Sequence, residues 1–271
     1  MAITDFNAYR SMQEAPSAPV CMTKNLISLA AGLNGSTWLA SPFAGSAPTT
    51  AVACDNTLTG RIRDYNPAGA ATLRLPKITI GQYLPGTWMI CDRLSHTGGL
   101  SGIVTTAQTT NLPTAALPRY TSGIGVIMCL EIYTVIGTTS TTVSVSYTNT
   151  TPTAGRTSSL VLFGATGRRE ASSCIMIPLQ EGDLGVTSVE SVTVTATTGT
   201  AGNFGVTLFK PLMLIPINPA GSVRTEIDPL INLGACLPDY DGDACLEWRW
   251  FSGATGSSGS FNASMCFSED R

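Results

Sequence analysis

The sequence predicts an all-β protein built around an antiparallel β-sandwich of the jelly-roll type. Three observations lead to this prediction. Apolar residues alternate with hydroxylated ones over long stretches, clusters of Gly, Pro and Thr separate these stretches, and charged residues make up only 12% of the 271 residues. Many short strands joined by such turns, without helices between them, are typical of an antiparallel sandwich.

An N-terminal arm, residues 1–56, is expected to begin with two short helices, the first ending before Pro16 and the second before Gly35. Their apolar faces carry Phe6, Tyr9 and Met12 in the first helix, and Leu26, Leu29 and Leu33 in the second. Neither segment is long enough to be stable alone in water. Both therefore need a surface, which their own sandwich or a neighbouring subunit can supply. Residues 36–56 are expected to be extended.

The sandwich domain is predicted over residues 57–217, where the apolar period is two. The alternation is clearest at 143–147 and 192–195, where one side is apolar and the other hydroxylated. Residues 101–122 are expected to form a long loop of the kind that is usually functional or interfacial. The expected strands are Leu58–Tyr65, Thr72–Ile80, Gly86–Leu94, Gly123–Val135, Thr141–Thr148, Ser159–Phe163, Ser173–Leu179, Val189–Thr197 and Phe204–Ile217.

A loop-rich C-terminal extension, residues 218–271, follows the sandwich. It contains one expected strand, which places Leu246, Trp248 and Trp250 on one face. That apolar strip is large enough to dock onto the sandwich or onto another molecule. The extension also holds three of the eight cysteines, and these thiols can oxidise within or between chains after release from the cell. They are Cys236, Cys245 and Cys266.

Charge and hydropathy exclude several classes of partner. The net charge is −3, so the molecule as a whole offers no electrostatic attraction for nucleic acid. The longest apolar stretch, 124–136, is interrupted by Glu131 and is too short to cross a bilayer. No targeting segment is recognisable, which predicts a chain made in the cytoplasm. Twelve of the fifteen basic residues are arginines, a bias that is typical of interfaces and also of GC-rich genomes.

Residue patterns for catalysis, cofactors or metals are absent from the sequence. His96 is the single histidine, which excludes a multi-histidine zinc site within one chain, and its turn-like surroundings predict bonding to nearby backbone. The run Asp239, Asp241 and Asp243 resembles the start of a calcium loop, but Ala244 and Trp250 stand where that loop needs Gly and Glu. We therefore predict no catalytic, cofactor-binding or metal-binding residues.

A family resemblance adds to this picture. The segment 178–186, followed by an alternating Val/Thr strand and a hairpin into 204–209, is similar to the strand entry of trimeric jelly-roll proteins. The larger stretch, 86–216, resembles structural proteins of tailed-bacteriophage virions, including capsid decoration, cement and fibre-like proteins. This resemblance implies a non-enzymatic virion component that forms a homotrimer and attaches to a capsid or neck surface. It supplies no catalytic residues and does not extend to the tail beyond residue 230.

The expected function is therefore that of a virion structural protein that binds and stabilises a phage capsid through large subunit interfaces. Its expected partners are itself and the major capsid protein or other virion proteins, without nucleic acid or membrane. The residues expected at these interfaces are those of the two helices and the tryptophan strip. Two alternatives stay open: a receptor- or glycan-binding fibre module, which needs exposed aromatic residues in a groove, and a capsular depolymerase, which needs paired carboxylates.

Overall fold

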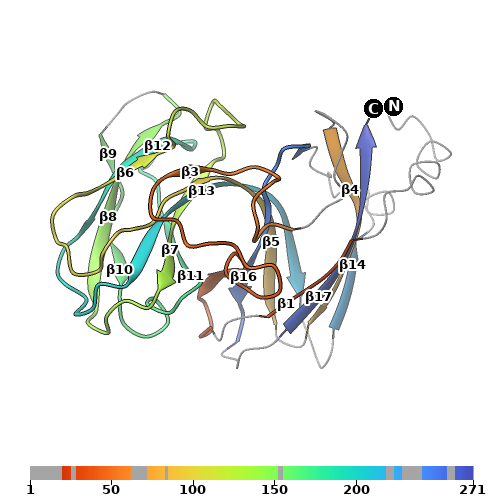
Figure 1. Ribbon diagram of the computed structural model, residues 1–271, viewed down its shortest axis with the longest axis horizontal. Helices are drawn as coiled ribbons and strands as arrows, with labels where there is room; N and C mark the ends of the chain where they lie inside the picture. Colours follow the sequence, from red (N-terminus) through yellow and green to blue (C-terminus); the bar gives the residue numbers. More distant parts are fainter. Residues whose placement is uncertain are drawn as a thin grey trace.

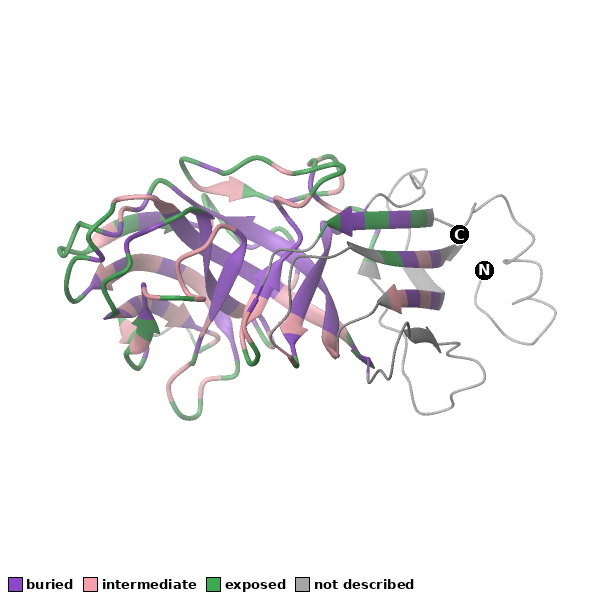
Figure 2. Cartoon of the chain, turned by 90° about the horizontal axis from the view of Figure 1, so that it is seen from below, coloured by how far each residue is buried: buried purple, intermediate pink, exposed green. Residues whose placement is uncertain are grey.

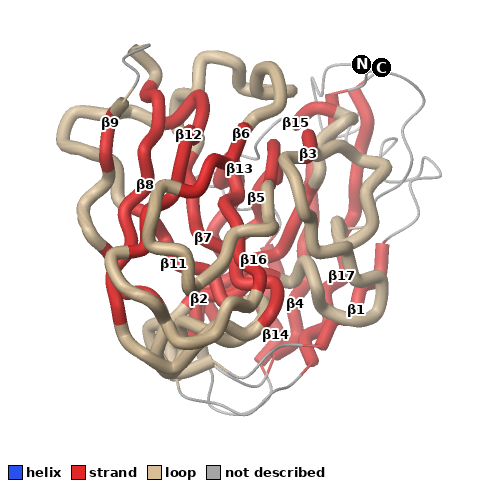
Figure 3. Tube along the Cα trace, turned by 60° about the vertical axis from the view of Figure 1, so that its left-hand side comes forward, coloured by secondary structure: helices blue, strands red, loops and turns tan. Residues whose placement is uncertain are grey.

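The structure of the protein is a computed structural model that describes residues 20–25, 29–62, 72–82, 85–151, 155–217, 223–227, 240–254 and 260–270. These residues form strands, turns and loops without any helix, which confirms the all-β, antiparallel prediction (Figure 3). The described residues therefore include no helix that could cross a membrane. Figure 1 shows three groups of strands side by side, with a barrel between two sheets.

A closed six-stranded barrel occupies the centre of the fold. Its strands pair in the order β13, β7, β11, β2, β16 and β5, and the additional pairing of β5 with β13 closes the ring. They are β2 (Asn34–Ser36), β5 (Gly86–His96), β7 (Ile127–Thr134), β11 (Ser173–Ile177), β13 (Asn203–Ile217) and β16 (Leu246–Ser252). The short strand β3 (Val52–Ala53) adds to the end of β5. Closure leaves these six strands without a free edge over their paired residues.

Two further sheets cover opposite sides of the barrel. The first has the order β10-β8-β12-β6 with β9 beside β8, and we call it the hydroxyl sheet because Ser and Thr occupy one of its faces. Its strands are β6 (Gln108–Leu112), β8 (Thr141–Asn149), β9 (Arg156–Thr157), β10 (Val161–Phe163) and β12 (Val186–Val194). The second, the terminal sheet, has the order β1-β17-β4-β14 with β15 beside β4. Its strands are β1 (Val20–Asn25), β4 (Thr72–Gln82), β14 (Val223–Ile227), β15 (Tyr240–Asp241) and β17 (Ser260–Asp270).

Each sheet packs against the barrel through its own apolar core. Between the hydroxyl sheet and the barrel, residues such as Val145 and Val192 meet Leu130 and Val206. Between the terminal sheet and the barrel, Ile80 and Met265 belong to a core that also contains the three tryptophans of β5 and β16. Most residues of the barrel strands are therefore buried on both faces, as the burial colours of Figure 2 show, although the C-terminal part of β13 is partly exposed. An all-buried strand such as β7 lacks the polar alternation of a solvated one.

The second predicted helix is wrong. Val20–Asn25 forms strand β1, which pairs with β17, and residues 29–36 form a turn followed by β2. Pairing with a distant strand satisfies the backbone of a segment that is too short for a stable helix. Leu29 is buried in the core beside the terminal sheet, and Leu33 packs against the same core. Phe6, Tyr9, Met12 and Leu26 lie outside the described residues.

Several loop and strand predictions also need correction. The predicted strand 58–65 is not a strand over its described residues, because an Asp55 carboxylate accepts the Thr57 backbone N–H (2.8 Å) and opens a turn there. The predicted loop 101–122 contains strand β6, and the predicted extended segment 36–56 contains β3. The remaining predicted strands of the sandwich have counterparts whose ends differ by a few residues.

Candidate functional site

Four charged side chains lie inside the barrel. Arg93 comes from β5, Glu131 from β7, and Glu247 and Arg249 from β16; each is at most 2% exposed. Their strands alternate, so neighbouring residues such as Leu94, Leu130 and Trp248 point outward into the apolar cores while these four point inward. Arg93 Nη2 donates to Glu131 Oε2 (2.6 Å) and Arg93 Nε to Glu247 Oε2 (3.0 Å). Arg249 Nη2 donates to Glu247 Oε2 (3.1 Å).

The charges of this cluster balance, since two guanidinium groups face two carboxylates. Burial alone would raise the pKa of the Glu247 carboxyl, but Arg249 and Arg93 outweigh it and lower that pKa to about 2. The Trp38 ring covers Arg93 with its centroid 4.2 Å from Cζ. The Glu247 carboxylate therefore stays ionised at neutral pH, and the bonds of the two carboxylates to the arginines hold β5, β7 and β16 together.

His96 ends β5 beside this cluster and is 3% exposed. Its Nδ1 accepts a hydrogen bond from Arg93 Nη1 (2.6 Å), so its partner is a side chain rather than the nearby backbone that the sequence suggested. Burial and the charge of Arg93 lower the pKa of His96 to about 2. The imidazole is therefore neutral at physiological pH, and its accepting nitrogen is occupied. Such a group does not serve as a general base.

Three free thiols share the barrel interior with the charges: Cys91, Cys129 and Cys174. Arg249 Nη1 lies 2.9 Å from Cys129 Sγ and 3.3 Å from Cys174 Sγ. Cys91 Sγ is 3.7 Å from the Glu247 carbonyl oxygen. Within the described part of the chain, no group of three or more His, Cys, Asp or Glu side chains has the arrangement of a metal site.

Of the three cysteines predicted to form disulfides in the C-terminal extension, the structure describes the side chain of one, Cys245. Cys245 is a buried free thiol beside Cys54. Cys236 lies outside the described residues, and the side chain of Cys266 is not described. Of the calcium-like run, Asp239 lies outside the described residues, and Asp241 Oδ1 accepts the backbone N–H of Asp243 (2.9 Å) in a turn.

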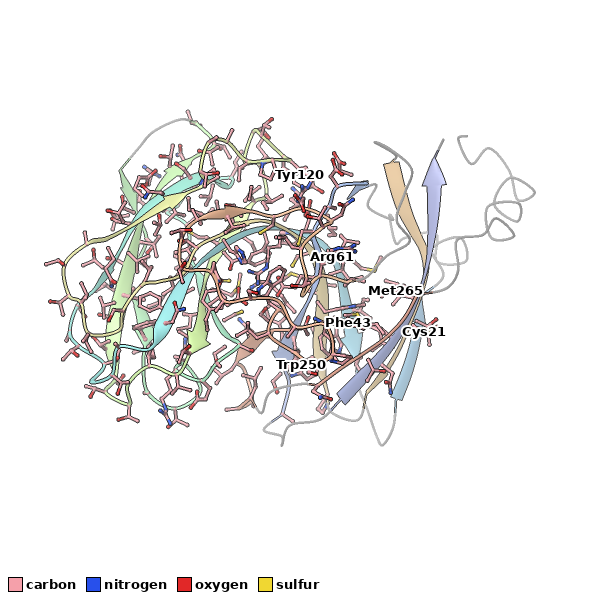
Figure 4. The ribbon with its side chains drawn as sticks, in the orientation of Figure 1. Cys21, Phe43, Arg61, Tyr120, Trp250 and Met265 are labelled. Carbon is pink, nitrogen blue, oxygen red and sulfur yellow. The ribbon has the colours of Figure 1, made fainter. Side chains whose placement is uncertain are left out.

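The predicted tryptophan strip belongs to the core of its own chain. Trp248 and Trp250 are 0% and 3% exposed, and both rings contact that of Trp88 on β5. Figure 4 shows Trp250 and Met265 between the barrel and the terminal sheet, where both belong to one apolar core. Of the two placements that the sequence allowed, docking onto the chain's own sheets is the one seen.

The outer face of the hydroxyl sheet has an unusual composition for a surface. Strands β6, β8, β10 and β12 contain one charged residue, Glu190, whose Oε1 accepts hydrogen bonds from Thr148 and Ser188 (2.7 Å each). Leu160 and Leu162 are 60% and 54% exposed beside it. The face is lined by Thr142, Ser144, Ser146, Thr148, Thr193 and Thr195. We call these hydroxyl side chains and the two leucines the uncharged face.

The edge of the uncharged face is formed by β10. This strand pairs with β8 on one side and is the last strand of its sheet, and none of the described strands pairs with its other side. Val161 and Phe163 point toward the core, while Leu160 and Leu162 point out. Exposed sheet edges are normally protected by charged residues or proline. Residues 157–163 contain neither.

Comparison with known proteins gives only distant structural neighbours. No family model and no curated protein matches the chain. Among solved structures, a mutant VP2 protein of infectious bursal disease virus in derived T=1 particles is 10% identical, with 96% of this chain and 83% of that chain covered and a TM-score of 0.20. A structure of the Gt strain of that virus is 10% identical, with 93% and 80% covered and a TM-score of 0.18.

Proposed function

We propose that the protein is a non-enzymatic structural component of a virion that works by binding other protein subunits. In its more specific form, the proposal is a homotrimeric decoration or cement protein that stabilises a bacteriophage capsid. The uncharged face is the observation that carries this proposal. An exposed sheet face with two leucines and an unprotected edge is the surface of a protein that meets a partner.

The chemistry of this face favours a protein partner. Burying the two leucines removes apolar surface from water, and full burial of one such side chain contributes about 1.5–3 kcal/mol. Hydroxyl groups such as those of Ser144 and Ser146 can exchange hydrogen bonds with water for hydrogen bonds with a second sheet. Glu190 is the one charged residue of strands β6, β8, β10 and β12, and Thr148 and Ser188 donate hydrogen bonds to it, so an approaching subunit meets little electrostatic repulsion. A second copy of the chain is therefore a suitable occupant.

The barrel supports the non-enzymatic part of the proposal. Its ionisable groups are buried and engaged with one another, and His96 is neutral with its Nδ1 occupied. An enzyme would need at least one such group to face a substrate. The alternative of a glycan-binding module depends on several exposed aromatic rings in a groove, but all four tryptophans are at most 3% exposed, and Phe43, 53% exposed, is the one aromatic side chain among the large exposed apolar residues of the described chain. No observation favours this alternative over a structural role.

The proposal is tested by sedimentation velocity of the purified full-length chain over a range of concentrations. We expect a reversible homo-oligomer, with the trimer as the expected species, and at least a tenfold weaker association for Leu162→Lys. Leu214→Lys is the matched control, because Leu214 is 60% exposed, close to the 54% of Leu162, but lies in the C-terminal half of β13, outside the hydroxyl sheet. A chain that stays monomeric at every concentration contradicts the proposal. An equal weakening of the association by Leu162→Lys and Leu214→Lys also contradicts the proposal.

A further inference from the structure

We propose that Cys129 and Cys174 form a modification site, in which a peroxide converts their thiols into a disulfide that links β7 to β11. The two cysteines come from neighbouring antiparallel strands of the barrel. Met176 is the cross-strand partner of Cys129, so Cys174 lies two residues further along and on the same, inward face. Diagonal residues on one face of a sheet are neighbours at a longer distance than directly opposite ones, so the positions of the two side chains decide whether their sulfur atoms meet.

Arg249 brings the two sulfur atoms together. A single guanidinium nitrogen, Nη1, lies 2.9 Å from Cys129 Sγ and 3.3 Å from Cys174 Sγ. The proximity of the two thiols also shifts their pKa values in opposite directions, since it lowers that of Cys129 and raises that of Cys174. Phe209 packs on the guanidinium, with its ring centroid 4.0 Å from Cζ, and restricts where the group can move. The sulfurs therefore lie side by side before any reaction occurs.

The same contact prepares Cys129 for oxidation. Burial raises the pKa of a thiol, but the hydrogen bond from Cys174 and the charge of Arg249 outweigh burial and lower the pKa of Cys129. A thiolate is the reactive form of cysteine. Cys174 is 6% exposed whereas Cys129 is fully buried, so a small oxidant reaches the pair beside Cys174.

The reaction balances with hydrogen peroxide as the oxidant. The Cys129 sulfur attacks the O–O bond, becomes a sulfenic acid and releases one water. The Cys174 sulfur then attacks the sulfenic sulfur, the S–S bond forms, and the second water leaves with the remaining oxygen. Two thiol hydrogens and two electrons pass to the peroxide. The product is neutral, so the balance between the two arginines and the two glutamates of the barrel is preserved.

A second thiol pair in the same protein provides an internal comparison. Cys54 and Cys245 are also adjacent, but both are fully buried, and the pKa of Cys245 is raised because of its contact with Cys54 and its burial. Neither thiol has a guanidinium hydrogen bond among the described contacts of the chain. Peroxide is therefore expected to oxidise the Cys129–Cys174 pair first.

The test treats the folded full-length protein with hydrogen peroxide, blocks free thiols in denaturant, and identifies linked peptides by mass spectrometry. We expect a product lighter by two hydrogens, a Cys129–Cys174 linked peptide, and a higher thermal unfolding midpoint than that of the untreated protein. Cys174→Ser should abolish the link, and Cys54→Ser should leave it unchanged. Recovery of both cysteines as blocked free thiols, or a link that joins other cysteines, would overturn the proposal.

Discussion

Replacing Arg93 by Met should destabilise the protein more than any comparable surface substitution. Arg93 is fully buried, and its guanidinium bonds both Glu131 and Glu247. The substitution keeps a side chain of similar length while removing the charge. It leaves two buried carboxylates with Arg249 as the remaining cation, whose Nη2 is 3.8 Å from Glu131 Oε2 and therefore too far for a hydrogen bond.

The expected size of the effect follows from the burial of the pair. Removing one partner of a buried ion pair costs about 3–5 kcal/mol, because the carboxylate that loses its hydrogen-bonded counterion stays away from water. Loss of the contact with Trp38, whose ring centroid lies 4.2 Å from Arg93 Cζ, adds about 0.5–2 kcal/mol. Better packing of the Met side chain offsets part of this. We expect a net loss of about 3–5 kcal/mol in the free energy of unfolding.

Urea unfolding followed by tryptophan fluorescence measures this loss, and a second variant isolates its cause. Arg93→Met combined with Glu131→Gln restores the charge balance, with one cation facing one carboxylate. The double variant should therefore be more stable than Arg93→Met alone, although it carries one more change. If the single variant loses less than about 1 kcal/mol, or if the second substitution adds a further loss, the buried charges do not act as described.

The remaining predictions concern pH and packing. The pKa of His96 is lowered from 6.5 to about 2 in the folded state, so below pH 6.5 the imidazole is protonated in the unfolded chain and neutral in the folded one. The free energy of unfolding should therefore fall by about 1.4 kcal/mol for each pH unit below that value. In urea titrations, His96→Asn should flatten this dependence between about pH 6 and pH 4. An unchanged slope would show that His96 is not the source of the pH dependence. Gly205→Ala should prevent stable folding, because its Cβ would lie 1.7 Å from the Thr97 carbonyl oxygen, whereas Gly81→Ala meets nothing closer than 4.0 Å. Equal thermal unfolding midpoints for the two alanine variants would contradict the packing around Gly205.

Much of the fold follows from local sequence patterns. The alternation at 143–147 predicts β8 and also which of its residues face the core. The pattern fails where pairing is distant: β1 reads as part of a helix because its partner β17 lies more than 200 residues away in the chain. It also fails for β6, whose QTTNL sequence is polar enough to resemble a loop. Only the completed sheet makes a strand of such segments.

The buried charges were missed for a related reason. In β16, Glu247 and Arg249 alternate with tryptophans, which places both charges on one face of the strand. That pattern ordinarily indicates a strand with one face in water. The closed ring of strands turns this face inward, and nothing in the local sequence indicates ring closure. Charged residues of both signs on several strands, as with Glu131 on β7, were the available signal.

The central claim is that the uncharged face is covered by another subunit, and hydroxyl-radical footprinting of the wild-type protein tests it most directly. The oxidation rate of Leu162 is compared between dilute and concentrated samples, with Leu214 as the reference because both leucines are more than half exposed in the single chain. The claim predicts that concentration protects Leu162 severalfold and leaves Leu214 unchanged. Equal oxidation of Leu162 in both samples, under conditions where the protein has associated, would contradict it.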